Sequence, residues 1–160
     1  MGQNSILITA EKSPLSDIRI TIKTGNKREL IKFNLMRELE IDEAFIGQEL
    51  NKNVSKYGFI GICLAKTSKR VRILELQKKK TFAIKYKHYK QSKDGGKVMA
   101  DTLVKELIYI DDEYISSCMD LIKAEESEDI LKHCVKTLEN RSFMVQSISA
   151  NLRAEANMIK

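Results

Sequence analysis

The sequence predicts an α+β protein: a β-rich N-terminal part that contains a small barrel, followed by a C-terminal domain of three to four helices. Two observations predict this class. In residues 17–91 several short runs alternate between apolar and polar side chains, and a period of two is typical of strands with one buried face. After a polar linker at residues 92–97, apolar residues recur at intervals of three and four, which indicates amphipathic helices.

The N-terminal segment, residues 1–44, is predicted to contain a β-hairpin. Residues 17–23 and 29–35 both place apolar side chains at every second position. Gly25 and Asn26 lie between them, and both residue types tolerate the positive φ angles of tight turns. The pattern is compatible with a hairpin packed on the barrel and with a separate sheet.

The middle segment, residues 45–91, is predicted to form the barrel. The predicted strands are residues 57–65, 70–76 and 81–88, and the predicted loops are residues 66–69 and 77–80. These loops have the length of hairpin connections, so the three strands are expected to be sequential neighbours in one curved sheet.

The last segment, residues 98–160, is predicted to be an acidic helical domain. One helix is expected directly after the linker, and Asp111-Asp112 then offer an N-cap for a second. Ser127 is expected to cap a third helix, and a final helix is predicted over residues 145–159.

Charge is distributed very unevenly between these segments. Residues 1–44 carry no net charge, residues 45–97 carry +11, and residues 98–160 carry −5. A small module with such a field is expected to attract a polyanion. The alternative is that the lysines keep a strand-rich segment soluble and blunt its edges, but solubilising surfaces usually mix charges of both signs.

Ten basic residues are the predicted nucleic-acid contacts: Lys66, Lys69, Arg70, Arg72, Lys78, Lys79, Lys80, Lys85, Lys87 and Lys90. On neighbouring strands of a barrel, the two arginines would share one face with Lys85 and Lys87. Lysines outnumber arginines in this set, which favours contact with the phosphate backbone over base readout. Stacking of single-stranded bases on Tyr57, Tyr86 and Tyr89 is a weaker alternative, because Tyr86 is expected to pack inside the barrel.

Residues 54–63 resemble the KOW motif, which opens a small SH3-like or Tudor-like barrel. Gly58 and Gly61 match its "G-hydrophobic-x-G" pattern, and the later run Val71-Arg72-Ile73 matches its basic and β-branched residues. A basic barrel with an acidic helical tail is also similar to the MotB family of early DNA-binding proteins of T-even phages. That resemblance implies sequence-tolerant binding to duplex DNA and a role in gene expression.

The sequence contains few residues in patterns typical of catalytic or metal-binding sites, so we expect a protein that is not an enzyme and needs no cofactor or metal. His88 and His133 are the only histidines, and His88 is expected to pack at the rim of the barrel. The three cysteines, Cys63, Cys118 and Cys134, are scattered and are expected to be small apolar residues in a reducing compartment. No apolar run of about 18 residues occurs, so we expect a cytoplasmic protein without a membrane partner.

These patterns favour a non-enzymatic, largely sequence-tolerant duplex DNA-binding protein that modulates transcription or nucleoid organisation. RNA is an alternative ligand, because KOW-like barrels also occur in ribosomal and elongation proteins. A protein-interaction adaptor that contacts the transcription machinery is another alternative. The acidic helical domain is expected to bind a protein partner, to cap the fold, or to screen the basic segment until nucleic acid displaces it.

Overall fold

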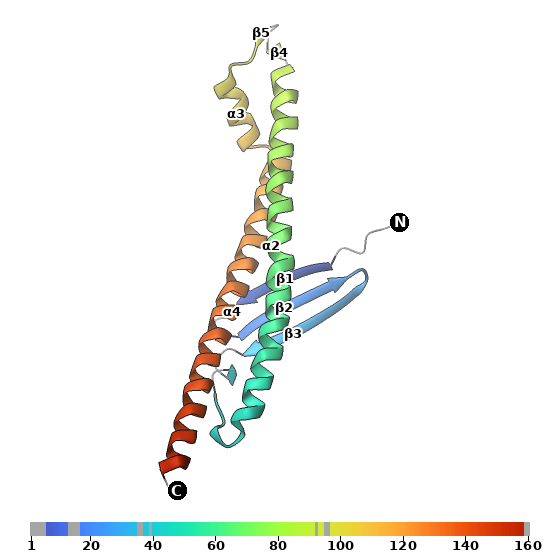
Figure 1. The fold of residues 1–160 in the computed structure, drawn as a ribbon. Coiled ribbons are helices and arrows are strands. Elements are labelled where there is room, and N and C mark those ends of the chain that lie inside the picture. The colour runs from blue at the N-terminus through green and yellow to red at the C-terminus, as the bar shows by residue number, and fades with distance from the viewer. Residues whose placement is uncertain are drawn as a thin grey trace. The chain divides into compact units, whose positions relative to one another are not determined.

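The computed structural model describes residues 6–12, 17–34, 37–38, 40–91, 93–94 and 97–158 (Figure 1). The chain divides into two compact units. The first contains the residues up to Thr67 and those from Glu126 onward, and the second is Ser68–Glu125. Two long helices, α2 (Ile46–Gln91) and α4 (Asp112–Met158), each contribute residues to both units.

A three-stranded antiparallel sheet lies in the first unit. Its strands are β1 (Ile6–Lys12), β2 (Asp17–Thr24) and β3 (Lys27–Asn34), in that spatial order. The predicted hairpin is confirmed as β2 and β3, and Gly25 takes a positive φ of 58° at their turn. Position 35, the last apolar position of the second predicted strand, lies outside the described residues.

The core of the first unit joins this sheet to the two long helices. Ile18 and Ile20 of β2 are almost fully buried, and they belong to one cluster with Ile60 of α2 and Leu131 and Leu138 of α4. The sheet therefore buries one face against helices, and the apolar alternation of β2 reflects that packing.

The predicted barrel is wrong, because residues 46–91 form the single helix α2 of 46 residues. Its buried residues in the first unit are spaced at helical intervals: Glu49, Asn53, Ile60, Cys63 and Thr67. The segments 66–69 and 77–80, expected to be loops, contain no glycine or proline and are rich in lysine, which a helix accommodates well. The resemblance to the KOW motif therefore does not reflect the fold.

The two glycines of the supposed motif lie inside α2. Gly58 and Gly61 face open space, since a Cβ added at either position would meet no atom within 4 Å. Neither residue is needed for a turn or for close packing.

The described part of the C-terminal segment contains two helices instead of the three or four predicted, and the second is much longer than expected. After β4 (Lys93–Asp94) and β5 (Lys97–Val98) come α3 (Asp101–Tyr109) and then α4, which continues without interruption for 47 residues. The glycine pair of the predicted linker lies outside the described residues.

The two predicted helix caps in this region have opposite outcomes. Asp111 is confirmed as the N-cap of α4, because its Oδ1 accepts hydrogen bonds from the backbone N–H groups of Glu113 and Tyr114. Ser127 starts no helix and is instead buried within α4.

The core of the second unit is small and partly aromatic. Val71 and Leu74 of α2 pack with Leu121 and Ala124 of α4. Next to them, Phe82 forms ring contacts with Tyr86, Tyr109 and Tyr114, at centroid distances of 5.8–6.5 Å. This cluster joins α2 to α3 and to the first turn of α4.

Candidate nucleic-acid interface

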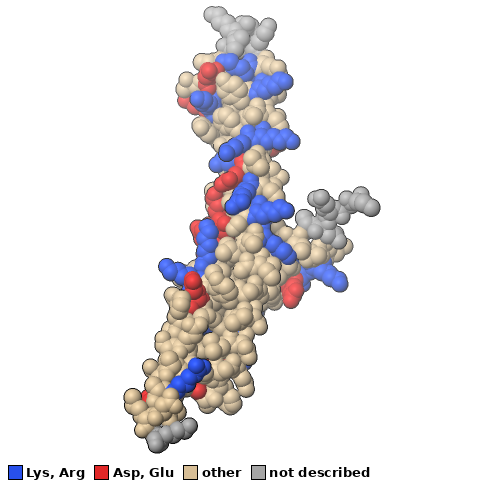
Figure 2. Space-filling view, viewed as in Figure 1, with Lys and Arg blue, Asp and Glu red and all other residues tan. Residues whose placement is uncertain are grey.

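Five of the predicted contacts are exposed on one face of α2 in the second unit. We call them the α2 cationic face: Lys69, Arg72, Lys79, Lys80 and Lys87. At 3.6 residues per turn these positions fall within an arc of about 100°. The buried residues Val71 and Leu74 lie on roughly the opposite side of the helix. Figure 2 shows Lys and Arg side chains recurring along this part of the surface, beside a smaller group of Asp and Glu side chains.

No carboxylate neutralises this face within the described part of the chain. The five side chains make neither an ion pair nor a side-chain hydrogen bond there. Unpaired, solvated cations at helical spacing can contact phosphates without first breaking an internal ion pair.

Lys85 and Lys90, by contrast, are held by carboxylates of the same unit. Lys85 Nζ lies 2.8 Å from Glu113 and 3.1 Å from Asp111, and these contacts raise the pKa of Lys85. Lys90 is paired with Asp101, which raises its pKa, and it also donates a 2.9 Å hydrogen bond to the carbonyl of Met99. Carboxylates of the acidic segment therefore pair with these two lysines, and screening of the basic segment until nucleic acid displaces the acidic one stays a prediction.

The remaining predicted contacts occupy other positions on α2. Arg70 and Lys78 are half-buried on the inner side of the helix, and Lys66 is exposed but belongs to the first unit. The shared face predicted for both arginines with Lys85 and Lys87 is wrong. In a helix, residues two positions apart point to nearly opposite sides, about 160° apart, so Arg72 and Lys87 face outward while Arg70 and Lys85 face inward.

The three tyrosines considered for base stacking are not grouped. Tyr86 donates a 2.9 Å hydrogen bond to Asp101, and Tyr89 donates a 2.8 Å hydrogen bond to Asp111. Tyr57 is exposed on the part of α2 that belongs to the first unit. A continuous stacking platform made from these three residues is therefore not formed.

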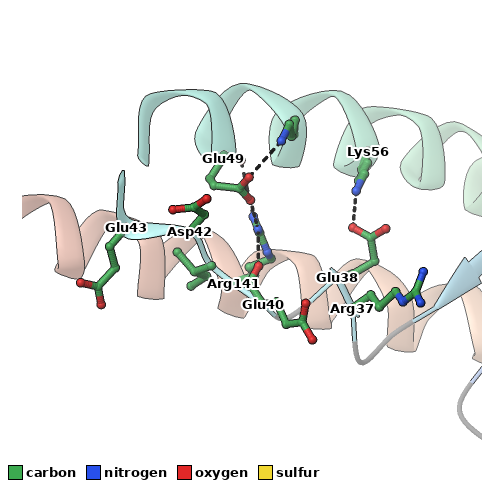
Figure 3. Close-up of a pocket in the computed structure, with 10 residues that line it drawn as sticks. Arg37, Glu38, Glu40, Asp42, Glu43, Glu49, Lys56 and Arg141 are labelled. Carbon is green, nitrogen blue, oxygen red and sulfur yellow. Dashed lines mark hydrogen bonds and ion pairs between the residues drawn. The ribbon is translucent and has the colours of Figure 1, made fainter. Parts of the chain in front are cut away.

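The first unit contains a polar pocket of about 600 Å³, which sequence reasoning missed (Figure 3). At its base Arg141 of α4 forms an ion pair with Glu49 of α2, and both side chains are almost fully buried. Arg141 also donates a 3.0 Å hydrogen bond to the carbonyl of Glu40. Figure 3 shows Lys56 of α2 pointing toward Glu38 at the rim.

This pair acts as a structural clamp between three segments of the first unit. Hydrogen bonds from Arg141 and then Lys52 lower the pKa of Glu49, so this carboxylate stays ionised at neutral pH. Nearby, Asn53 donates hydrogen bonds of 3.0 Å to the Leu138 carbonyl and 2.5 Å to the Ser142 hydroxyl. A sequence signal for Arg141 did exist: it lies three residues after Leu138 and four before Val145, at a position of the buried stripe.

Metal-binding and membrane-spanning features are absent from the residues that the structure describes. No group of three His, Cys, Asp or Glu side chains there could hold a metal ion. No described helix is both long and apolar enough to cross a bilayer. His88, expected to pack at a barrel rim, is exposed on α2 with its ring 5.3 Å from that of Tyr89.

The cysteines divide into two buried thiols and one that is partly exposed. Burial raises the pKa of Cys63, and it raises the pKa of Cys134 to about 11. Both are therefore protonated at neutral pH and serve as apolar core residues, as expected. Cys118 is half-buried in the second unit.

The comparisons with known proteins concern the fold. No family model matches the chain, and no curated protein matches it significantly. Solved structures of the bacteriophage T4 recombination mediator protein UvsY superimpose with a TM-score of 0.62. The fold is similar to that of UvsY.

The likeness to UvsY extends over most of both chains. One crystal form of UvsY is 20% identical and covers 76% of this chain and 92% of its own. A second form is 18% identical with the same coverage, and a third is 20% identical and is covered over 95% of its length. At this identity the likeness shows the fold alone: a small antiparallel sheet combined with long helices.

Proposed function

We propose that the chain is a non-enzymatic DNA-binding protein that contacts phosphates largely without reading base sequence. The observation that carries this proposal is the α2 cationic face, whose five side chains are exposed and unpaired within the described residues. Four lysines and one arginine favour contact with phosphates over bidentate base readout.

The helix is a suitable support for such contacts. The stretch from Lys69 to Lys87 spans about 27 Å at a rise of 1.5 Å per residue. The five charges are separated by three, seven, one and seven residues along this length. A duplex carries about one phosphate charge per 1.7 Å of its axis, so each cation has phosphates within reach, and this supports the duplex DNA predicted from the sequence.

We further propose that the protein serves DNA recombination as an accessory factor. The support is the similarity of its fold to UvsY, a recombination mediator. The role in transcription or nucleoid organisation, and the likeness to the MotB family, rested on the barrel that α2 replaces, so neither carries the proposal.

The first experiment is a fluorescence-anisotropy titration with duplex DNA, single-stranded DNA and duplex RNA of matched length at several salt concentrations. Five phosphate contacts predict that the logarithm of duplex affinity falls with log salt at a slope of about −4.5. A slope near zero, or no DNA binding at low salt, would overturn the proposal.

The matched variants remove equal charge from two different places. Replacing Lys69, Arg72, Lys80 and Lys87 by glutamine should lower the salt slope by about 3.6. Replacing four exposed cations of the sheet, Lys23, Lys27, Arg28 and Lys32, by glutamine should leave the slope nearly unchanged. Equal effects of the two quadruple variants would show that binding follows net charge and not this face.

The titration also decides between the proposal and its alternatives. RNA bound at least about tenfold more tightly than DNA would favour an RNA-binding protein. A protein adaptor remains the candidate from another class, because acidic protein surfaces also complement exposed lysines. Absence of nucleic-acid binding at 20 mM salt would favour that adaptor.

A further inference from the structure

A second pocket, of about 500 Å³, lies beside the α2 cationic face and within the second unit. Its α2 side consists of Glu75, Lys78, Lys79 and Phe82, and its α4 side of Tyr114 and Leu121. The α2 residues are spaced by three or four positions, so they form one row along the helix. Lys79 belongs both to this pocket and to the cationic face.

One wall of the pocket is aromatic and remains partly accessible. Phe82 and Tyr114 meet edge to face, with their ring centroids 5.8 Å apart. Both side chains are only half-buried, so a flat aromatic ligand can still reach them. Phe82 is also stacked against Tyr86 at 6.3 Å, which holds its ring in place.

The cations of the pocket lack internal partners. Lys85 and Lys90, farther along the same helix, are paired with carboxylates. Within the described residues Lys78 and Lys79 have no ion pair, although Lys78 is half-buried. An anion at this point would give Lys78 the partner that a half-buried ammonium otherwise lacks.

We propose that this pocket binds one nucleotide, with the base against Phe82 and Tyr114 and the phosphate between Lys78 and Lys79. Charge complementarity and the aromatic wall together specify the ligand, because a nucleotide combines an aromatic ring with an anion. Glu75, one helical turn beyond the lysines, opposes additional negative charge. A monophosphate should therefore bind more tightly than a triphosphate.

The pocket deepens the proposed function. Binding of a nucleotide that is part of a DNA strand rests on that function, whereas binding of a free nucleotide does not. Its chemistry is the same in both cases. Binding of the free nucleotide tests the pocket by itself, and binding of DNA tests the pocket together with the cationic face.

The first arm is an NMR titration of the 160-residue chain with AMP, adenosine, ATP, inorganic phosphate and an acidic peptide. We expect AMP to shift signals of Phe82, Tyr114 and Leu121, and to bind more tightly than adenosine, ATP or phosphate. Equal responses to AMP and phosphate would show that only charge is recognised and would overturn the proposal. Tighter binding of an acidic peptide than of AMP would do the same.

The variants separate a binding effect from a folding effect. Phe82→Leu should weaken AMP binding about fivefold or more, through loss of base stacking. Because Phe82 also packs in the aromatic cluster, Lys79→Gln provides a second test at an exposed position. The matched controls are Tyr57→Leu and Lys23→Gln, an aromatic and a cation outside the pocket, and neither should change AMP binding.

The second arm compares a short DNA strand with one that lacks a single base but keeps its phosphates. We expect the complete strand to bind more tightly, and Phe82→Leu to abolish the difference. If DNA binds with the expected salt slope but the missing base has no effect, the pocket proposal fails and the proposed function stands. If AMP binds and DNA does not, the proposed function fails and the pocket stands.

Discussion

The buried ion pair between Arg141 and Glu49 is a residue-level feature with a large expected effect on stability. The buried guanidinium of Arg141 is compensated by the carboxylate of Glu49, and it donates hydrogen bonds to the backbone carbonyls of Glu49 and Glu40. Removing Arg141 leaves the buried carboxylate of Glu49 with only the more exposed Lys52 as a partner, and that is more costly than losing a surface pair.

Arg141→Met should lower the free energy of unfolding by about 3 kcal/mol, because Glu49 would remain buried with only the exposed Lys52 as a partner. The measurement is urea denaturation followed by circular dichroism. Arg153→Met, at an exposed position on the same helix, is the control and should change stability by less than about 0.5 kcal/mol. Similar losses in both variants would contradict the clamp.

Asp111 is the second residue with a distinct prediction, which concerns pH. The hydrogen bond from Tyr89, together with contacts from Lys85 and the Tyr114 backbone, lowers the pKa of Asp111 from 3.8 to about 2. Because the folded pKa is the lower one, this stabilisation is complete above pH 3.8 and is lost as the pH falls toward 2.

The comparison of wild type with Asp111→Asn tests this linkage, since asparagine keeps the N-cap but does not ionise. The variant should melt at a lower temperature than wild type at pH 6, and the gap should close between about pH 4 and pH 2. A gap that stays constant down to pH 2 would show that the charge of Asp111 is not what stabilises the fold.

At the scale of elements, α2 shows why the alternating runs misled the sequence interpretation. A helix with buried residues at intervals of three and four also contains short stretches in which apolar and polar residues alternate. Residues 70–76 alternate, yet Val71 and Leu74 are the residues that pack in the core, and Ile73 is exposed. Length and the lack of turn residues distinguish the two structures better than a period read over seven positions.

Proline substitution discriminates between the observed helix and the predicted loop. Gln77→Pro removes a backbone N–H donor inside α2 and should cost about 3 kcal/mol, with a measurable loss of helical circular dichroism. In a hairpin loop the same change would cost little. Gln77→Ala is the control and should leave both stability and helicity close to wild type.

The sequence was sufficient for the parts of the fold that local signals determine. The hairpin of β2 and β3 followed from clean alternation around Gly25, and the N-cap of α4 followed from Asp111. The long helices did not follow, because their continuity depends on packing between distant segments, as in the contact of Ile60 with the core residues of α4. The ten candidate contacts were named from charge alone, and their division into exposed, paired and half-buried groups required the helix.

At the scale of the whole molecule, the chain segments of the first unit are far apart in sequence. Strands from the N-terminal segment share one core with Leu131, Cys134 and Leu138 near the other end of the chain. The acidic C-terminal segment is therefore structural in part, and its removal would not simply expose the basic segment for binding.

Truncation after Glu125 should unfold the first unit, including the sheet, because it removes the helical half of that core. Loss of dispersed NMR signals from β1, β2 and β3 would be the readout. Truncation after Ala150 is the control, since residues 151–158 are all exposed, and it should leave those signals in place. A sheet that persists in the shorter protein would refute the shared core.

The open surroundings of Gly58 and Gly61 mean that α2 can be stabilised by substitution at these two positions. Glycine in a helix interior costs up to about 1 kcal/mol relative to alanine, and here no neighbouring atom obstructs a methyl group. Replacing both glycines by alanine should raise the melting temperature without touching the cationic face. Because of its higher melting temperature, this double variant would be better suited than wild type to crystallisation and to the titrations described above.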